Sequence, residues 1–253
     1  MNGIGLLKLY FNRFWRFALI NLIYFLVTLP LPAEWYALIH RYQAAGGYTG
    51  LLAGVGILVI PAAFLPQPVL SLWRLLAAVL RGPLLLGMAE VFAETSREKH
   101  SDMSKMFSQI SFRTVFFGVC DIALTAVLLY NVLGNFDNFN GAVQAVLRVS
   151  RYVSALMLAA YLTMRPYFYI MMAVTELRAF AAIKNTAICV MLRPWPAVAS
   201  AAFGAVVWFV TLFTVPLATL IMLPLLTYSL CGFFYAGMVY PVIEQYVIKR
   251  EEA

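Results

Sequence analysis

The sequence has little charge for its length. Of its 253 residues, 63% are hydrophobic and 11% are charged, and the mean hydropathy is +0.85. A soluble domain carries about 25% charged residues. This chain therefore lacks the polar side chains that would cover a water-facing surface. The composition predicts an integral membrane protein.

Residue types that carry catalysis or bind metals are also scarce. The two histidines, His40 and His100, lie in different polar segments, which argues against an HExxH helix, a histidine-based triad and a haem bundle. The three cysteines are far apart without a CxxC, and we expect them to be small buried hydrophobes. No GxSxG, P-loop or GxGxxG motif is present. We therefore expect no enzyme, no cofactor and no hydrolysis of ATP by this chain.

The formal net charge of +7 does not indicate nucleic-acid binding. No long stretch interleaves basic residues with polar ones. In a membrane protein, such an excess is typical of basic cytoplasmic loops that face anionic lipid headgroups.

The apolar runs predict an all-α, polytopic transmembrane helix bundle of about six spans, with residues 1–253 forming a single integral-membrane domain. Residues 1–13 are expected to be a short interfacial helix that leads into the first span. The clearest runs are 14–31, 114–133, 151–175, 197–215 and 217–240.

Residues 48–93 do not resemble one ordinary span. They contain Pro61, the pair Pro66 and Pro68, and a Gly82-Pro83 break. Non-helical backbone at membrane depth survives only inside protein or beside a cavity. We expect a broken or re-entrant element here, interrupted between Pro61 and Pro68, with Arg74 and Arg81 as buried basic residues turned away from lipid. The alternative is two ordinary spans with a turn at Pro66–Pro68.

Basic residues predict the orientation. They occur in the N-terminal segment, in tract 94–113, in tract 176–193 and in the tail, whereas loop 134–147 has none. By the positive-inside rule, all four basic regions and both termini face the cytoplasm. The number of crossings is then even, so residues 48–93 make one net crossing. Arg148 and Arg151, near the outer interface, argue mildly against this arrangement.

Two charges are predicted to meet inside the bundle. Arg165, in LTMRPYFYIMM, lies about 15 Å from the cytoplasmic end of its span at 1.5 Å per residue. Asp121, in GVCDIAL, lies at a similar depth of roughly 12 Å on the neighbouring antiparallel span. We expect an Asp121–Arg165 contact at a kink near Pro166. Either the pair fixes how two spans pack, or it lines a solute site, or each residue faces its own water.

The two cytoplasmic tracts are candidate docking segments. Tract 176–193 has helix-like apolar spacing and indicates an amphipathic interfacial helix, with Glu176, Arg178, Lys184 and Asn185 as candidate partner contacts. Tract 94–113 supplies Arg97, Glu98 and His100. The simpler interpretation is that both tracts are surface-bound connectors.

Three stretches resemble the YesL family of bacterial inner-membrane proteins, a family of unknown function. They are NRFWRFALINLIYFLVTLPLP (12–32), RGPLLLGMAEVFAETSREKH (81–100) and YFYIMMAVTELRAFAAIKNTAICVML (167–192). The chain departs from the family after the histidine, where Met106-Phe107 and Ser111 replace an Asp-Phe and an Asn. The resemblance implies a small polytopic protein of the bacterial inner membrane, often encoded beside carbohydrate ABC-importer genes.

Two functions follow as expectations. The first is a non-enzymatic accessory, regulatory or assembly subunit of a carbohydrate ABC importer, in contact with its permease or ATPase. The alternative is a carrier or channel for a small solute or lipid, with a sugar or lipid ligand at a buried polar site. The lipid bilayer is a partner in both cases.

Overall fold

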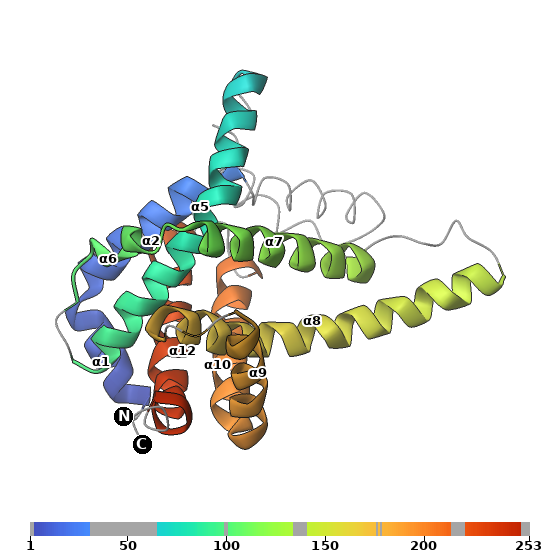
Figure 1. The fold of residues 1–253 in the computed structure, drawn as a ribbon. Helices are drawn as coiled ribbons and strands as arrows, with labels where there is room; N and C mark the ends of the chain where they lie inside the picture. Colours follow the sequence, from blue (N-terminus) through green and yellow to red (C-terminus); the bar gives the residue numbers. More distant parts are fainter. Residues whose placement is uncertain are drawn as a thin grey trace.

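The computed structural model describes residues 3–30, 65–98, 101–133, 141–175, 177, 179–213 and 221–248. All regular elements in these ranges are helical (Figure 1). They are α1 (Gly3–Asn12), α2 (Phe14–Thr28), α5 (Gln67–Ser96), α6 (Lys105–Ser108), α7 (Phe112–Leu133), α8 (Ala142–Val174), α9 (Ala179–Leu192), α10 (Pro194–Phe213), η1 (Leu223–Thr227), α12 (Tyr228–Ile243) and η2 (Glu244–Ile248).

Five of these helical segments are long and apolar enough to cross a membrane. They are α5, α7, α8, α10 and the continuous run of η1, α12 and η2. Two shorter apolar helices, α2 and α9, accompany them. The chain is therefore a polytopic membrane protein with an all-helical fold, as the sequence predicts.

Helix α5 lies at the centre of the bundle and is unbroken. It packs against α7, α6, α12, α8 and α2. It begins directly after Pro66 and continues through Gly82 and Pro83, so the predicted Gly82-Pro83 break is wrong. Pro83 removes one backbone donor, a loss that a transmembrane helix tolerates when neighbouring helices pack closely around it. The predicted interruption between Pro61 and Pro68 falls partly outside the described residues.

Helix α8 is longer than predicted. It starts at Ala142, so residues 142–150 extend the helix instead of the loop. Gly141, at φ 67°, takes a left-handed conformation that suits glycine just before the first turn. At 1.5 Å per residue its 33 residues span about 50 Å. In Figure 1 its first half extends away from the other helices.

The helix at the C-terminal end also exceeds its prediction. It was expected to end near Tyr240, yet it continues through Pro241 to Ile248 and closes with the wide turn η2. The opposite end of the same run is another wide turn, η1, which contains Pro224.

A buried asparagine supports the turn η1. Asn21 of α2 is fully buried, and its Nδ2 donates to the carbonyl oxygen of Leu223 at 2.9 Å. Its Oδ1 accepts from the backbone N–H of Ser229 at 2.7 Å, and the Ser229 hydroxyl lies 2.8 Å from that of Tyr10. A wide turn leaves backbone groups without their usual helical partners. Asn21 satisfies one acceptor and one donor of this kind.

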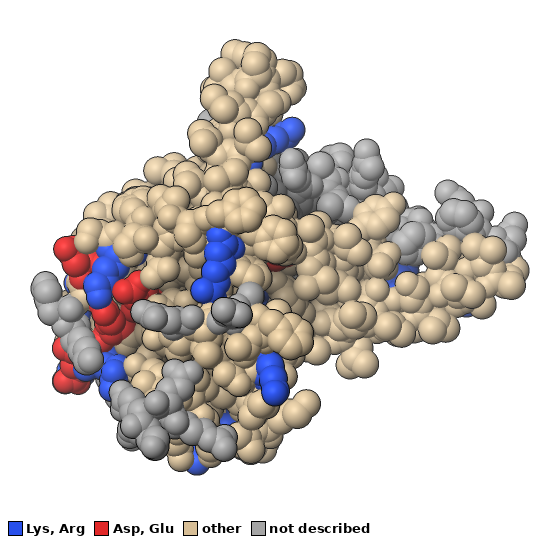
Figure 2. Space-filling view, viewed as in Figure 1, with Lys and Arg blue, Asp and Glu red and all other residues tan. Residues whose placement is uncertain are grey.

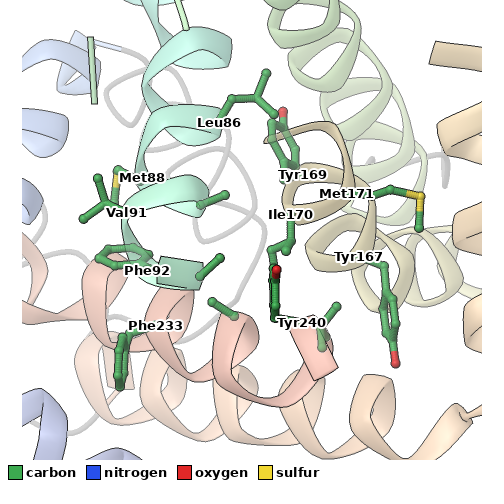
Figure 3. Close-up of a cluster of buried hydrophobic side chains, with 14 of the residues drawn as sticks. Leu86, Met88, Val91, Phe92, Tyr167, Tyr169, Ile170, Met171, Phe233 and Tyr240 are labelled. Carbon is green, nitrogen blue, oxygen red and sulfur yellow. The ribbon is translucent and has the colours of Figure 1, made fainter. Parts of the chain in front are cut away.

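The core is rich in aromatic side chains. Tyr10 stacks on Phe17 with ring centroids 4.9 Å apart, and Phe17 lies 5.5 Å from Phe92 and 5.0 Å from Phe233. Figure 3 shows side chains of α5, α8 and α12 meeting in the same core. Helix α1 contributes to it, since its Leu6 and Tyr10 are buried. Helix association in lipid depends on such packing, because lipid tails are as apolar as the side chains.

The free cysteines divide into two groups. Cys189 and Cys231 are buried, as predicted, whereas Cys120 is exposed on α7. The expectation of a buried Cys120 is therefore wrong. A sulfhydryl is apolar enough to lie on a lipid-facing helix surface.

Candidate functional site: a charged cluster inside the bundle

A close crossing of α5 and α7 involves two glycines. A side-chain carbon added at Gly82 of α5 would lie 2.7 Å from the Cα of Gly118 of α7 and would overlap the carbonyl oxygen of Thr114. A carbon added at Gly118 would lie 2.6 Å from the Cα of Gly82. Small residues allow helix backbones to approach in membranes. This crossing places Arg81, beside Gly82, next to the face of α7 that carries Asp121.

Asp121 is the centre of a charged cluster. Its side chain is only 4% exposed, and its Oδ2 accepts a hydrogen bond of 2.7 Å from Nη2 of Arg165. The structure thus brings together the two residues that the sequence pairs. Nη2 of Arg81 lies 3.5 Å from the same oxygen. The arginines come from two different helices, so Asp121 joins α5, α7 and α8.

Tyrosines complete the surroundings of the carboxylate. The hydroxyl of Tyr161 donates to Oδ1 of Asp121, one turn before Arg165 on α8. The guanidinium carbon of Arg165 lies 5.6 Å from the ring centroid of Tyr169, which is cation–π geometry. Tyr24 of α2 and Tyr228 of α12 have ring centroids 4.8 Å apart and interact electrostatically with both arginines.

The cluster lies well inside its helices. Asp121 is roughly 14 Å along α7 from Phe112, and Arg165 is roughly 14 Å from the end of α8 at Val174. Pro166 lies inside α8, which continues as helix through it. A kink at Pro166 stays a prediction.

Arg81 and Tyr161 are members of the cluster that the sequence did not pair with Asp121. Arg81 was predicted as a buried basic residue, and its side chain is 11% exposed. Arg74, two turns earlier on α5, is partly exposed. The sequence feature that could have indicated the position of Arg81 is the adjacent Gly82. The glycine that faces Gly82 at the helix crossing, Gly118, lies 36 positions later, so the two glycines form no recognisable sequence motif.

A second group of polar contacts forms one end of the bundle. Arg97 donates to Oε1 of Glu244 at 2.6 Å and to the hydroxyl of Tyr240 at 3.1 Å, which joins tract 94–113 to η2. Arg16 of α2 donates to the backbone carbonyl of Ser101. We call this region the polar end. It connects the N-terminal, 94–113 and C-terminal segments.

The polar end also includes α6 and the loop before α9. Nζ of Lys105 lies 2.5 Å from Glu94 and 3.5 Å from Glu90, and the hydrogen bond to Glu94 raises the pKa of Lys105. Arg113 donates to the carbonyl of Leu177, which brings tract 176–193 to the same region. On the face shown in Figure 2, acidic side chains gather at the left, mixed with basic ones.

The remaining predicted docking residues are only partly described. Lys184 is exposed and Asn185 is half-buried on α9, whereas Glu176 and Arg178 lie outside the described residues. Glu98 is exposed with φ 60°, and His100 lies outside the described residues. The packed face of α9 consists of Ala182, Thr186 and Cys189.

Among the described residues, no group of three or more His, Cys, Asp or Glu side chains could hold a metal ion. The chemistry of the charged cluster is that of charge pairing and hydrogen bonding. It offers two guanidinium groups, one carboxylate and several phenolic hydroxyls.

Comparison with known proteins yields no relative: no family model, no curated protein and no solved structure matches the chain.

Proposed function

We propose that this polytopic membrane protein is a non-enzymatic accessory or assembly subunit, which contacts a transport complex through its polar end. The observation that supports the proposal is that the N-terminal segment, tracts 94–113 and 176–193, and the C-terminal helix meet at one end of the bundle. Arg16, Arg97 and Arg113 each bridge two of these segments. A polar surface with both signs of charge, held in place by the helices, is suited to a complementary protein surface.

The partner class comes from the resemblance of the three quoted stretches to the YesL family. That resemblance implies a permease or ATPase of a carbohydrate ABC importer in the bacterial inner membrane. Lys184, inside α9, and Arg193, directly after its end, are exposed basic residues of tract 176–193 that could make such contacts.

Affinity purification from native membranes in a mild detergent tests this proposal. We expect the permease or ATPase subunits of a carbohydrate importer to be identified with the chain by mass spectrometry. Lys184→Glu should reduce their recovery. Arg148→Glu makes the same charge change at an exposed position in the first half of α8 and should not reduce it. Recovery of the chain alone would contradict the proposal.

A second candidate is a carrier or channel for a small solute or lipid. The buried cluster of Asp121, Arg81 and Arg165 favours it, because ionisable groups inside a membrane commonly mark solute pathways. Flux of labelled glucose and labelled glucuronate into proteoliposomes would test it. Asp121→Asn should lower the flux of whichever sugar the wild-type chain transports. Absence of flux for both sugars would count against this candidate.

A further inference from the structure

The charged cluster has an excess of positive charge. Arg81 and Arg165 are both within 3.5 Å of Asp121 Oδ2, so two guanidinium groups share one carboxylate. Arginine stays protonated in proteins. The other acidic residues in the described ranges are Glu90, Glu94, Glu98, Asp102 and Glu244, which belong to the polar end. Among the described residues the cluster therefore carries one net positive charge, and an unbalanced charge at membrane depth is costly.

The same cluster has hydrogen-bond donors without acceptors. Nε of Arg81 and the hydroxyl of Tyr169 are buried, and neither has a partner among the described residues. Tyr169 is 7% exposed, and the guanidinium carbon of Arg165 lies 5.6 Å from its ring centroid. An unsatisfied buried donor is costly. A group that brings negative charge and oxygen lone pairs would balance the charge and accept these hydrogen bonds.

The exposed fractions show which members a ligand can reach. The side chain of Arg165 is 23% exposed and that of Arg81 is 11% exposed, whereas Asp121 is 4% exposed. The two arginine side chains are therefore partly accessible, whereas the carboxylate is enclosed. Asp121 keeps the two guanidinium groups in place and neutralises only one of them.

We propose that Arg81, Arg165 and Tyr169 form an anion-binding site that takes a carboxylate or a phosphate group. Its source is either a lipid headgroup or a free solute, and both present the same oxygen chemistry to the arginines. This inference relies on the second candidate function only where it connects anion binding to transport. Binding can be measured without flux and without an importer, so each proposal fails separately.

The test uses the full chain purified in a neutral detergent and measures the melting temperature against ligand concentration. Glucuronate and inorganic phosphate serve as free anions, with glucose as the neutral control. Nanodiscs of phosphatidylglycerol are compared with nanodiscs of phosphatidylcholine for the lipid source. We expect a saturable rise of the melting temperature with an anionic probe and none with its neutral control.

Tyr169→Phe removes only the unpartnered hydroxyl and should raise the Kd of the effective probe by roughly tenfold or more. Tyr152→Phe is the matched control on the exposed face of α8 and should leave the Kd unchanged. Arg81→Gln should abolish binding, with exposed Arg148→Gln as its control. A response to glucuronate or phosphate alone identifies a free solute, and a response to phosphatidylglycerol alone identifies a headgroup. No response to any anion, or an unchanged Kd in Tyr169→Phe, would overturn the proposal.

Discussion

At the scale of single residues, Asn21 illustrates how one polar side chain supports an irregular helix. It hydrogen-bonds the carbonyl of Leu223 and the N–H of Ser229 from a neighbouring helix. Asn21→Leu keeps the approximate side-chain size but leaves both backbone groups unpaired. We expect it to lower the free energy of unfolding by about 1–3 kcal/mol for each lost partner.

Denaturant titration in detergent micelles measures this change. Asn12→Leu is the control, because Asn12 is exposed at the end of α1. Equal stability of the two variants would show that Asn21 does not hold η1.

The Asp121–Arg165 pair gives a second prediction at this scale. Asp121→Arg places a third positive charge beside Arg81 and Arg165, and Arg165→Asp places two carboxylates together. Each single reversal should strongly reduce the yield of folded protein, measured by size-exclusion chromatography. The double swap should restore part of it, because the pair is re-formed while Arg81 then faces a like charge. Harmless single variants, or a swap that restores nothing, would remove the pair from consideration.

Sequence reasoning reached Asp121 and Arg165 because both are charges in apolar runs at matching depths. It did not reach the pairing with Arg81, since that depends on where α5 crosses α7. Nor did it reach the bond from Tyr161, because a tyrosine in an apolar run carries no signal of its partner. A contact between two antiparallel neighbouring helices can be predicted from the depth of each residue along its helix. A contact at a helix crossing can be predicted only when the position of that crossing is known.

At the scale of elements, the crossing of α5 and α7 depends on Gly82 and Gly118. A methyl group at either position would overlap backbone atoms, which cannot move aside as a side-chain end can. We expect Gly82→Ala to lower the free energy of unfolding by about 1–3 kcal/mol, the usual cost of overpacking. The same variant should weaken the contact between Arg81 and Asp121.

Unfolding in detergent would again provide the measurement. Gly3→Ala is the control, since nothing lies within 4 Å of a carbon added there. If Gly82→Ala were as stable as Gly3→Ala, the two helices would have to be less tightly packed than described.

Helix boundaries were harder to predict than helix positions. The expected span 114–133 agrees with α7, and the expected span 197–215 largely agrees with α10. Helix α8 begins nine residues early because AVQAVLRVS contains good helix formers despite its polar neighbours. Helices continue through Pro83, Pro166 and Pro241, so these prolines do not mark helix ends. Surrounding helices compensate for the lost backbone bonds.

Helix α9 shows that apolar spacing does not by itself tell which face of a membrane helix contacts protein. Its large apolar residues Phe180, Ile183 and Met191 are exposed, as they would be on the interfacial helix that the sequence predicts, where the apolar side meets lipid. The residues that pack are the small ones, Ala182, Thr186 and Cys189. Lipid solvates large apolar side chains, and helix contacts favour small ones. The pattern predicted the helix, and the small residues form its contact with the bundle.

At the scale of the whole molecule, composition predicted the class of fold, because a chain with 11% charged residues cannot cover a soluble surface. Orientation in the membrane remains a prediction from the basic residues. At the polar end, segments from the N-terminus, both tracts and the C-terminal helix lie together. A common side of the membrane for all four is the simplest arrangement of such a bundle.

Cysteine labelling tests this orientation directly. In a background in which Cys120, Cys189 and Cys231 are replaced, single cysteines are introduced at exposed Ser104, Lys184 and Ala142. An impermeant maleimide added outside intact cells should label position 142, at the start of α8, and should reach positions 104 and 184 only after the membrane is permeabilised. The 33 residues of α8 span about 50 Å, which exceeds a hydrocarbon core of about 30 Å, so its first turn should be exposed to the reagent unless the helix is strongly tilted. Labelling of positions 104 and 142 from the same side would contradict the predicted orientation, because α7, which lies between them, would then not cross the membrane.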